Sequence, residues 1–252
     1  MLAKNRLEII DTIRGLTMIS MILYHFCWDL KYINGMDMPW YGTFGSYLWQ
    51  QSICWTFITI SGFCMHFARK PVRNGIIVFL CGIIITCVTE IFLPEAPVYF
   101  GVLTMLGSCM ILIGLAMKMI PAKIDPFWGL FVSIILFAMT KSINSGFINL
   151  FIKKLYLPQI LFGQGGTDGL QNSFLTYLGF MQKGFYSSDY FSLMPWIFLF
   201  LAGYFLHDVL KSRFDSKIFH ADIKPLSFLG RYSLLVYMLH QPVLYAVTMI
   251  IR

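Results

Sequence analysis

Four ionisable residues stand in the first apolar stretch of the chain, DTIRGLTMISMILYHFCWDL at residues 11–30. They are Asp11, Arg14, His25 and Asp29, spaced three, eleven and four residues apart. On a helix, which turns by about 100° per residue, these side chains fall within an arc of roughly 60° that also holds Met18 and Ile22. Ionisable side chains within a membrane span usually face a bundle interior or a water-filled cavity. The spacing predicts a membrane helix with an inward polar stripe.

His25 and Asp29 are the part of this stripe suited to acid–base chemistry. Four residues apart on one helix face, the carboxylate can hold the imidazole, fix its tautomer and stabilise the imidazolium formed by proton transfer. A neutral imidazole is a base or a nucleophile. Arg14 lies eleven residues earlier, about 16 Å along a helix and about half the thickness of a bilayer core. A simpler reading makes Arg14 and Asp11 an interfacial pair at a helix end.

A second polar group is expected in LGRYSLLVYMLHQPVL at residues 229–244. Ser233, Tyr237 and His240 share a helix face there, and Gln241 lies at its edge. If this last span runs in the same direction as the first, His240 lies at a similar depth to His25. The two histidines could then line one pocket, for example as base and oxyanion donor. Alternatively, Tyr237 and His240 only join helices through hydrogen bonds.

The composition indicates a polytopic membrane protein. Of the 252 residues, 58% are hydrophobic and only 12% are charged, more apolar surface than a soluble domain can bury. The net charge of +7 does not indicate a nucleic-acid partner, because the basic residues are dispersed in short loops between apolar runs. The six cysteines lie inside apolar runs, where they are expected to be buried hydrophobes. Metal-ligand spacing, a Walker loop and a dinucleotide fingerprint are not found, so no metal is expected.

Seven apolar runs predict an all-α integral membrane protein, a bundle of about seven to eight transmembrane helices in a single domain over residues 1–252. The expected spans are 11–30, 45–68, 75–93, 98–117, 126–143, 190–210 and 226–251. Residues 144–189 are ambiguous, because they hold an amphipathic piece, a glycine-rich turn (Gly163, Gly165, Gly166 and Gly169) and a half-length apolar piece. A crossing there would reverse the direction of all that follows.

Seven spans place the two termini on opposite sides of the membrane and divide the 19 basic residues unevenly. Those on the side of the N-terminus are Lys4, Arg6, Arg14, Arg69, Lys70, Arg73, Lys118, Lys123, Lys211, Arg213, Lys217, Lys224 and Arg231. Those on the other side are Lys31, Lys141, Lys153, Lys154, Lys183 and Arg252. The positive-inside rule then predicts a multi-pass protein of the plasma membrane with a cytoplasmic N-terminus.

Several motifs resemble those of the transmembrane acyltransferases. The arginine and histidine of IDTIRGLTMISMILYHF match the R-x10-H signature of that superfamily, and ITISGFCMHFAR resembles its SG-containing helix. The stretches SSDYFSLMPWIF and LGRYSLLVYMLHQPVL favour the heparan-α-glucosaminide N-acetyltransferase-like group over the acyltransferase-3 group. The resemblance extends from Asp11 to about Tyr245. One departure is Thr104, where relatives often have a histidine that a threonine cannot replace as a base.

The resemblance implies a membrane acyltransferase that takes an acetyl or other short acyl group from acyl-CoA, usually acetyl-CoA, on the cytoplasmic side. The acceptor would be a hydroxyl or amine of an extracytoplasmic glycan or sugar. The expected catalytic residues are His25, Asp29 and His240. The expected donor-binding residues are Arg14, Arg69, Arg73 and Arg231, although the positive-inside rule also explains the last three. The expected acceptor-binding residues are Asp189, Tyr190, Tyr237 and Glu90.

Simpler readings remain beside these assignments. Asp189 fits a helix N-cap, Glu90 a water-facing residue and His66 a snorkelling interfacial residue. The expected partners are the lipid bilayer, acyl-CoA and the glycan, with a homodimer left open. Two rival functions are a proton-coupled transporter of a small polar solute, which also places ionisable groups inside a bundle, and a non-catalytic membrane protein whose polar stripe serves packing.

Overall fold

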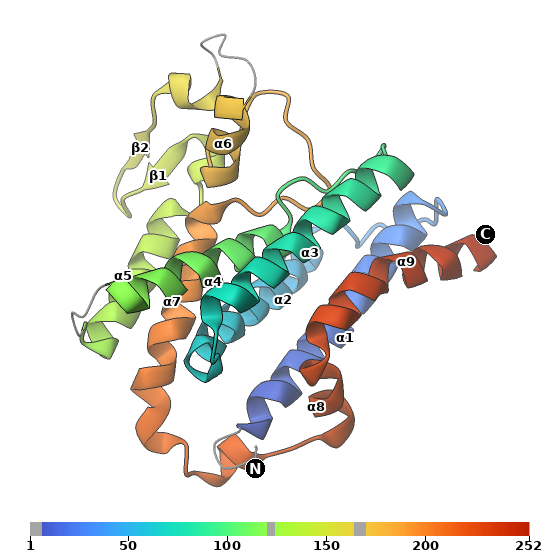
Figure 1. Cartoon of the computed structure of the whole chain (residues 1–252). Coiled ribbons are helices and arrows are strands. Elements are labelled where there is room, and N and C mark those ends of the chain that lie inside the picture. The colour runs from blue at the N-terminus through green and yellow to red at the C-terminus, as the bar shows by residue number, and fades with distance from the viewer. Residues whose placement is uncertain (1–6, 120–123, 164–169, 252) are drawn as a thin grey trace. The chain divides into compact units, whose positions relative to one another are not determined.

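The computed structural model describes residues 7–119, 124–163 and 170–251 and is built almost entirely from helices (Figure 1). The α-helices are α1 (Glu8–Tyr32), α2 (Phe44–Phe63), α3 (Pro71–Phe92), α4 (Val102–Met119), α5 (Pro126–Thr140), α6 (Leu170–Leu178), α7 (Leu193–Leu210), α8 (Lys224–Arg231) and α9 (Ser233–Ile251). Short 3-10 turns are η1 (Cys64–Phe67), η2 (Ile143–Ser145), η3 (Gln159–Phe162), η4 (Lys211–Arg213) and η5 (Lys217–His220).

Six helical segments in the described part of the chain are long and apolar enough to cross a membrane. They are α1, α3, α4, α5 with η2, α7 with η4, and α9. The prediction of an all-α membrane bundle is therefore confirmed. Helix α2, the remaining expected span, has 20 residues and no charge, but Gln50 and Gln51 lie within it and it does not reach the hydropathy of the other six.

The ambiguous region adds no spanning helix among its described residues. Strands β1 (Phe147–Asn149) and β2 (Lys154–Tyr156) form an antiparallel hairpin. Helix α6 has nine residues, about 14 Å of helix, whereas a bilayer core is about 30 Å thick. Parts of the sequence predictions lie outside the described residues, namely Lys4, Arg6, Lys123, Gly165, Gly166, Gly169 and Arg252.

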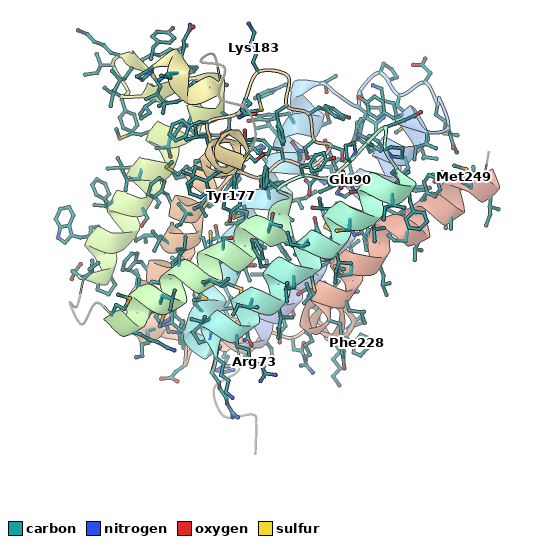
Figure 2. All side chains as sticks on the ribbon, turned by 45° about the horizontal axis from the view of Figure 1, so that its top comes forward. Arg73, Glu90, Tyr177, Lys183, Phe228 and Met249 are labelled. Atoms are coloured by element: carbon teal, nitrogen blue, oxygen red, sulfur yellow. The ribbon has the colours of Figure 1, made fainter. Side chains whose placement is uncertain are left out.

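The expected last span at 226–251 is wrong in one respect, because it consists of two helices. Helix α8 ends at Arg231, Tyr232 leaves the helical conformation with φ −101° and ψ 22°, and α9 begins at Ser233. Helix α8 is strongly amphipathic. Ser227 and Gly230 are buried, whereas Phe228 is exposed and projects away from the ribbon (Figure 2). The break leaves a short separate helix, α8, followed by a span of 19 residues, α9.

The chain divides into two compact units, residues 1–60 with 210–252 and residues 61–209. In the first unit, α1 and α9 lie side by side and run in the same direction (Figure 1). Near the start of α1, the hydroxyl of Thr12 lies 3.1 Å from that of Ser227 in α8, the short helix that precedes α9. Just beyond its end, Asn34 Nδ2 donates to the carbonyl of Thr248 at 3.1 Å. Residues near the start of α1 therefore lie beside the start of the α8–α9 segment, and residues near its end lie beside the end of α9.

Two glycines let α8 approach α1 at backbone distance. A Cβ added to Gly15 would lie 1.9 Å from the carbonyl oxygen of Leu226, and one added to Gly230 would lie 2.0 Å from that of Asp11. Only glycine fits at either position, because real Cβ atoms do not approach backbone within 3.0 Å. The glycines of the IRG and LGR motifs are thus the two halves of one helix–helix contact.

The second unit is centred on the pairing of α3 with α4 (Figure 1). Here too glycines allow close approach, because a Cβ on Gly107 would lie 2.5 Å from the backbone nitrogen of Phe79. The first half of α4, residues 102–109, is buried throughout. Arg73 and Glu90 stand at opposite ends of α3 (Figure 2). The hydroxyl of Thr104 donates to the carbonyl of Gly101 at 2.7 Å, so it bonds within its own helix turn.

Candidate active site between α1 and α9

Two histidines face each other across the α1–α9 contact. The ring centroids of His25 and His240 lie 5.0 Å apart, with an interplanar angle of 61°. His240 is buried and His25 is half-buried. The prediction that the two side chains lie at a similar depth is therefore confirmed, and it follows from the parallel course of the helices. The packing forms an imidazole pair from residues 215 positions apart in the sequence.

The hydrogen bonds of His240 fix its tautomer. Its Nδ1 lies 2.5 Å from the carbonyl oxygen of Tyr237, one turn earlier in α9. A carbonyl oxygen can only accept, so Nδ1 carries the proton and Nε2 keeps its lone pair. The Nε2 atom is buried and has no hydrogen-bond partner in the described structure. His240 thus presents an oriented, unused basic nitrogen inside the helix packing.

Asp29 does not hold His25 as expected. Its Oδ1 accepts a hydrogen bond of 2.9 Å from Nε2 of Gln241, and no hydrogen bond or ion pair joins it to His25 in the part of the chain that the structure describes. The reason is geometric. Helix α9 packs alongside α1, and this brings Gln241, the residue after His240, within hydrogen-bond distance of the carboxylate. The i, i+4 spacing predicted that His25 and Asp29 share a helix face. It could not predict that Asp29 would bind Gln241 of another helix instead.

Unpartnered buried polar atoms gather around this contact. Among the described residues they include Asp29 Oδ2, His240 Nε2 and Gln241 Oε1, and Asp29 is completely buried. A buried polar atom without a partner costs about 1–3 kcal/mol and is uncommon in native proteins. Three such atoms on interacting or adjacent residues mark a place where a ligand with hydroxyl or amino groups can supply the missing hydrogen bonds.

A cluster of charged residues lies at the other end of α1. Asp11 is buried, and its two oxygens lie 3.8 Å from Nη1 of Arg14 and 3.7 Å from Nε of Arg231. Nη1 of Arg14 also donates to the carbonyl of Gly230 at 3.5 Å. The structure thus shows the Asp11–Arg14 pair of the simpler reading and adds Arg231 to it. Two guanidinium groups therefore lie beside one buried carboxylate.

The other predicted donor-binding and acceptor-binding residues have local partners or are exposed. Tyr237, in the first unit, stacks on Phe57 with centroids 6.4 Å apart. In the second unit, Arg69 and Arg73 are exposed, and exposed Glu90 accepts a hydrogen bond of 3.2 Å from the hydroxyl of Tyr99.

Asp189 and Tyr190 precede α7, which begins at Leu193, so Asp189 is not its N-cap. Asp189 lies against Gly101, where an added Cβ would be 3.4 Å from Oδ2. Tyr190 donates to the carbonyl of Thr176 at 2.5 Å, and burial raises the pKa of its phenol to about 12. Tyr190 therefore connects the segment before α7 to α6.

Two contacts between helices, one in the site and one in the second unit, were not predicted from the sequence. The bond from Gln241 to Asp29 links helices far apart in the chain, and only the position of Gln241 beside His240 hinted at it. In the second unit, His207 and Asp208 lie beside His66, although neither was singled out and no motif links them. Contacts of this kind depend on which helices pack together.

The family model described as "Heparan-alpha-glucosaminide N-acetyltransferase, catalytic" matches residues 6–242 of the chain. This match contains Arg14, His25, both motif glycines and His240. No curated protein and no solved structure matches the chain.

Proposed function

The chain belongs to the heparan-alpha-glucosaminide N-acetyltransferase catalytic family, and from this premise we propose that it transfers an acetyl or other short acyl group from acyl-CoA to an extracytoplasmic sugar or glycan. The acyl group would go to a hydroxyl or an amine. Membership makes the chain a membrane protein of an acetyltransferase family, and the helices α1, α3, α4, α5, α7 and α9 fit that class.

The observation that carries the proposal is the oriented His240 beside His25. Nε2 of His240 takes the proton from the acceptor hydroxyl or amine as that atom bonds to the acyl carbon. The carbon–sulfur bond of the thioester then breaks, and the imidazolium returns its proton to the CoA thiolate. His25 is the second group of the pair, as alternative base or transient acyl carrier, since a neutral imidazole serves in either role.

Asp29 and Gln241 complete the acceptor pocket in this proposal. Their unpartnered Oδ2 and Oε1 accept hydrogen bonds from the hydroxyl or amino groups of a sugar, and the bond between the two side chains holds both in place. A buried site of this kind favours an acceptor that satisfies these atoms over one that leaves them unpaired. The polar atoms thus support a polyhydroxylated acceptor.

Arg14 and Arg231 form the donor end of the proposed site. They lie at the N-terminal end of α1 beside Asp11, and guanidinium groups are suited to binding the phosphates of CoA. Eleven residues of helix separate Arg14 from His25, about 16 Å, which a pantetheine arm can bridge. With a cytoplasmic N-terminus in the plasma membrane, the donor would enter from the cytoplasm and the acceptor from outside. By the positive-inside rule, exposed Arg69 and Arg73 of the second unit would be cytoplasmic and would attract the anionic donor there.

The test is acyl transfer by the purified full chain in lipid nanodiscs, with radiolabelled acetyl-CoA and a panel of hexosamine and hexose acceptors. His25→Ala and His240→Ala are compared with His220→Ala, which removes an exposed histidine paired with Glu8 at 3.3 Å. Loss of general base catalysis costs about 10²–10⁴-fold in rate, so both site variants should fall at least about 100-fold while His220→Ala stays active. Full activity in both site variants, or solute flux without label transfer, would overturn the proposal.

A further inference from the structure

The β1–β2 hairpin of the second unit is apolar at its tip, although it lies outside the helices that can span the membrane. Its turn, residues 150–153, has the sequence LFIK. Ile152 is 93% exposed and Phe151 is 69% exposed, and Leu155 and Tyr156 of β2 are exposed beside them. Contiguous apolar side chains on a surface mark a site of contact with a membrane or another protein.

The end of α5 sets the level at which this hairpin begins. Helix α5 has 15 residues, about 22 Å of helix, whereas a bilayer core is about 30 Å thick. The same apolar segment continues through η2 to Ser145. The carbonyl of Gly146 then accepts a hydrogen bond of 2.9 Å from the amide of Leu157, and β1 contacts α5 (Figure 1). If the segment 126–145 spans the core, the hairpin begins and ends at the level of the lipid headgroups.

The turn satisfies its own backbone, as a segment that contacts lipid must. The amide of Leu150 donates to the carbonyl of Lys153 at 2.9 Å, and that of Ile152 donates to the carbonyl of Leu150 at 2.7 Å. The amide of Phe151 donates to Oδ1 of Asn149 at 3.2 Å. The amides of residues 150–152 therefore need no water, and the turn can enter the less polar boundary of a bilayer.

Phe151 holds a backbone conformation that does not favour a large side chain. Its φ is 64°, in the left-handed region, where glycine, asparagine and aspartate fit at lower cost. Formation of the turn therefore does not account for the phenyl ring, whereas contact with an apolar phase outside the hairpin does.

The charge around the tip is positive. Residues 126–167 contain no aspartate or glutamate but three lysines, of which Lys153 and Lys154 belong to the hairpin. Nζ of Lys154 lies 4.7 Å from the ring centroid of Phe147, a cation–π contact, and Lys153 is exposed. Basic side chains beside apolar ones are typical of segments that bind the surface of a bilayer with anionic lipids.

We propose that the β1–β2 hairpin anchors the second unit to the surface of the bilayer, beyond its role in any acyl transfer. Phe151 and Ile152 lie at the boundary of headgroups and acyl chains, and Lys153 and Lys154 lie beside the phosphates of anionic lipids. A two-stranded hairpin is at best marginally stable in water, so burial of its tip in lipid also stabilises the hairpin itself.

The full chain with its six cysteines replaced by alanine, in vesicles of phosphatidylcholine and phosphatidylglycerol, tests the anchor. Ile152→Cys carries an environment-sensitive fluorophore, and Lys183→Cys, exposed on the loop before α7, carries the same dye as the matched control. We expect the dye at 152 to be quenched by lipids spin-labelled near the headgroup and shielded from aqueous iodide, and the dye at 183 to show the reverse. Lys153→Gln should lower the ratio of docked to free hairpin about fivefold, read from fluorescence lifetimes, because it removes one charge near an anionic surface.

Equal quenching by iodide at positions 152 and 183 would overturn the proposal. Shielding at 152 without quenching by the spin-labelled lipid would assign the tip to a second copy of the chain or another protein, and would also overturn it. An unchanged docked fraction in phosphatidylcholine alone, with no effect of Lys153→Gln, would contradict the role of the lysines. Since none of these measurements uses acyl transfer, the result is independent of the proposed enzyme activity. The unfolding temperature of each labelled chain shows whether it remains folded.

Discussion

At the residue scale, Gln241 supplies the hydrogen bond to Asp29, whose carboxylate is the completely buried one of α1. Gln241→Ala removes the donor to Oδ1 and leaves both oxygens of Asp29 without a described partner. A hydrogen bond to a charged group is worth about 1.5–3 kcal/mol, so we expect a lower unfolding temperature and weaker acceptor binding. Thermal unfolding in detergent and KM for the acceptor measure the two effects.

Gln51→Ala is the matched control for this substitution. Gln51 is also a glutamine on a long helix of the first unit, and its side chain accepts a bond of 3.0 Å from Trp55 at an exposed position. Exposed hydrogen bonds contribute little, so its unfolding temperature should stay near that of the parent chain. Equal losses in the two variants would show that the buried carboxylate does not depend on Gln241.

Tyr190 gives a pH-dependent prediction outside the membrane spans. Burial raises the pKa of its phenol to about 12, above the ordinary value of 10. Below pH 10 the phenol is neutral in both folded and unfolded chains, so its full contribution to the free energy of unfolding is present there. Between pH 10 and 12 it ionises only when unfolded, and stability is lost as pH rises. Tyr190→Phe should reduce this loss over that pH range, whereas Tyr186→Phe, at an exposed position, should not. Unfolding temperatures measured from pH 8 to 11 test it.

At the element scale, the docking of α8 on α1 rests on two glycines. Gly15→Ala or Gly230→Ala would place a Cβ within 2.0 Å of a backbone carbonyl oxygen, so one helix must move away from the other. Overpacking of this kind costs about 1–3 kcal/mol or more, and the displacement also shifts Arg231 from Asp11. We expect a lower unfolding temperature and a higher KM for acetyl-CoA.

Gly45→Ala tests whether the effect is due to position rather than to glycine itself. Gly45 lies near the start of α2, and an added Cβ there would meet only Thr43 Oγ1, at the ordinary distance of 3.7 Å. In a helix, alanine is favoured over glycine, so this variant should be as stable as the parent chain or slightly more so. A similar loss from all three substitutions would contradict the docking contact.

At the scale of the whole molecule, the fold class and the approximate helix ranges could be predicted because both follow from local sequence. Apolar runs gave the long helices, and helical periodicity gave the shared face of Asp11, Arg14, His25 and Asp29. The break at Tyr232 was missed, because the apolar pattern of 226–251 continues across it. Pairings between distant helices, such as Gln241 with Asp29 or His66 with His207, depend on packing and leave no mark in periodicity.

The orientation of the second unit in the membrane is tested by chemical labelling. Its two ends should react with a thiol reagent from opposite sides of the membrane. Arg73 and Lys183 lie at opposite ends of this unit (Figure 2), and the positive-inside rule assigns Arg73 to the cytoplasm and Lys183 to the outside. In a chain with its six cysteines replaced by alanine, Lys183→Cys should react with an impermeant maleimide added to intact cells. Arg73→Cys should react only after the cells are opened. Leu80→Cys, exposed in the middle of α3, should face lipid and react in neither case. Labelling of Arg73→Cys in intact cells would reverse the orientation of this unit and place Arg69 and Arg73, which we propose attract the donor, on the side away from acyl-CoA.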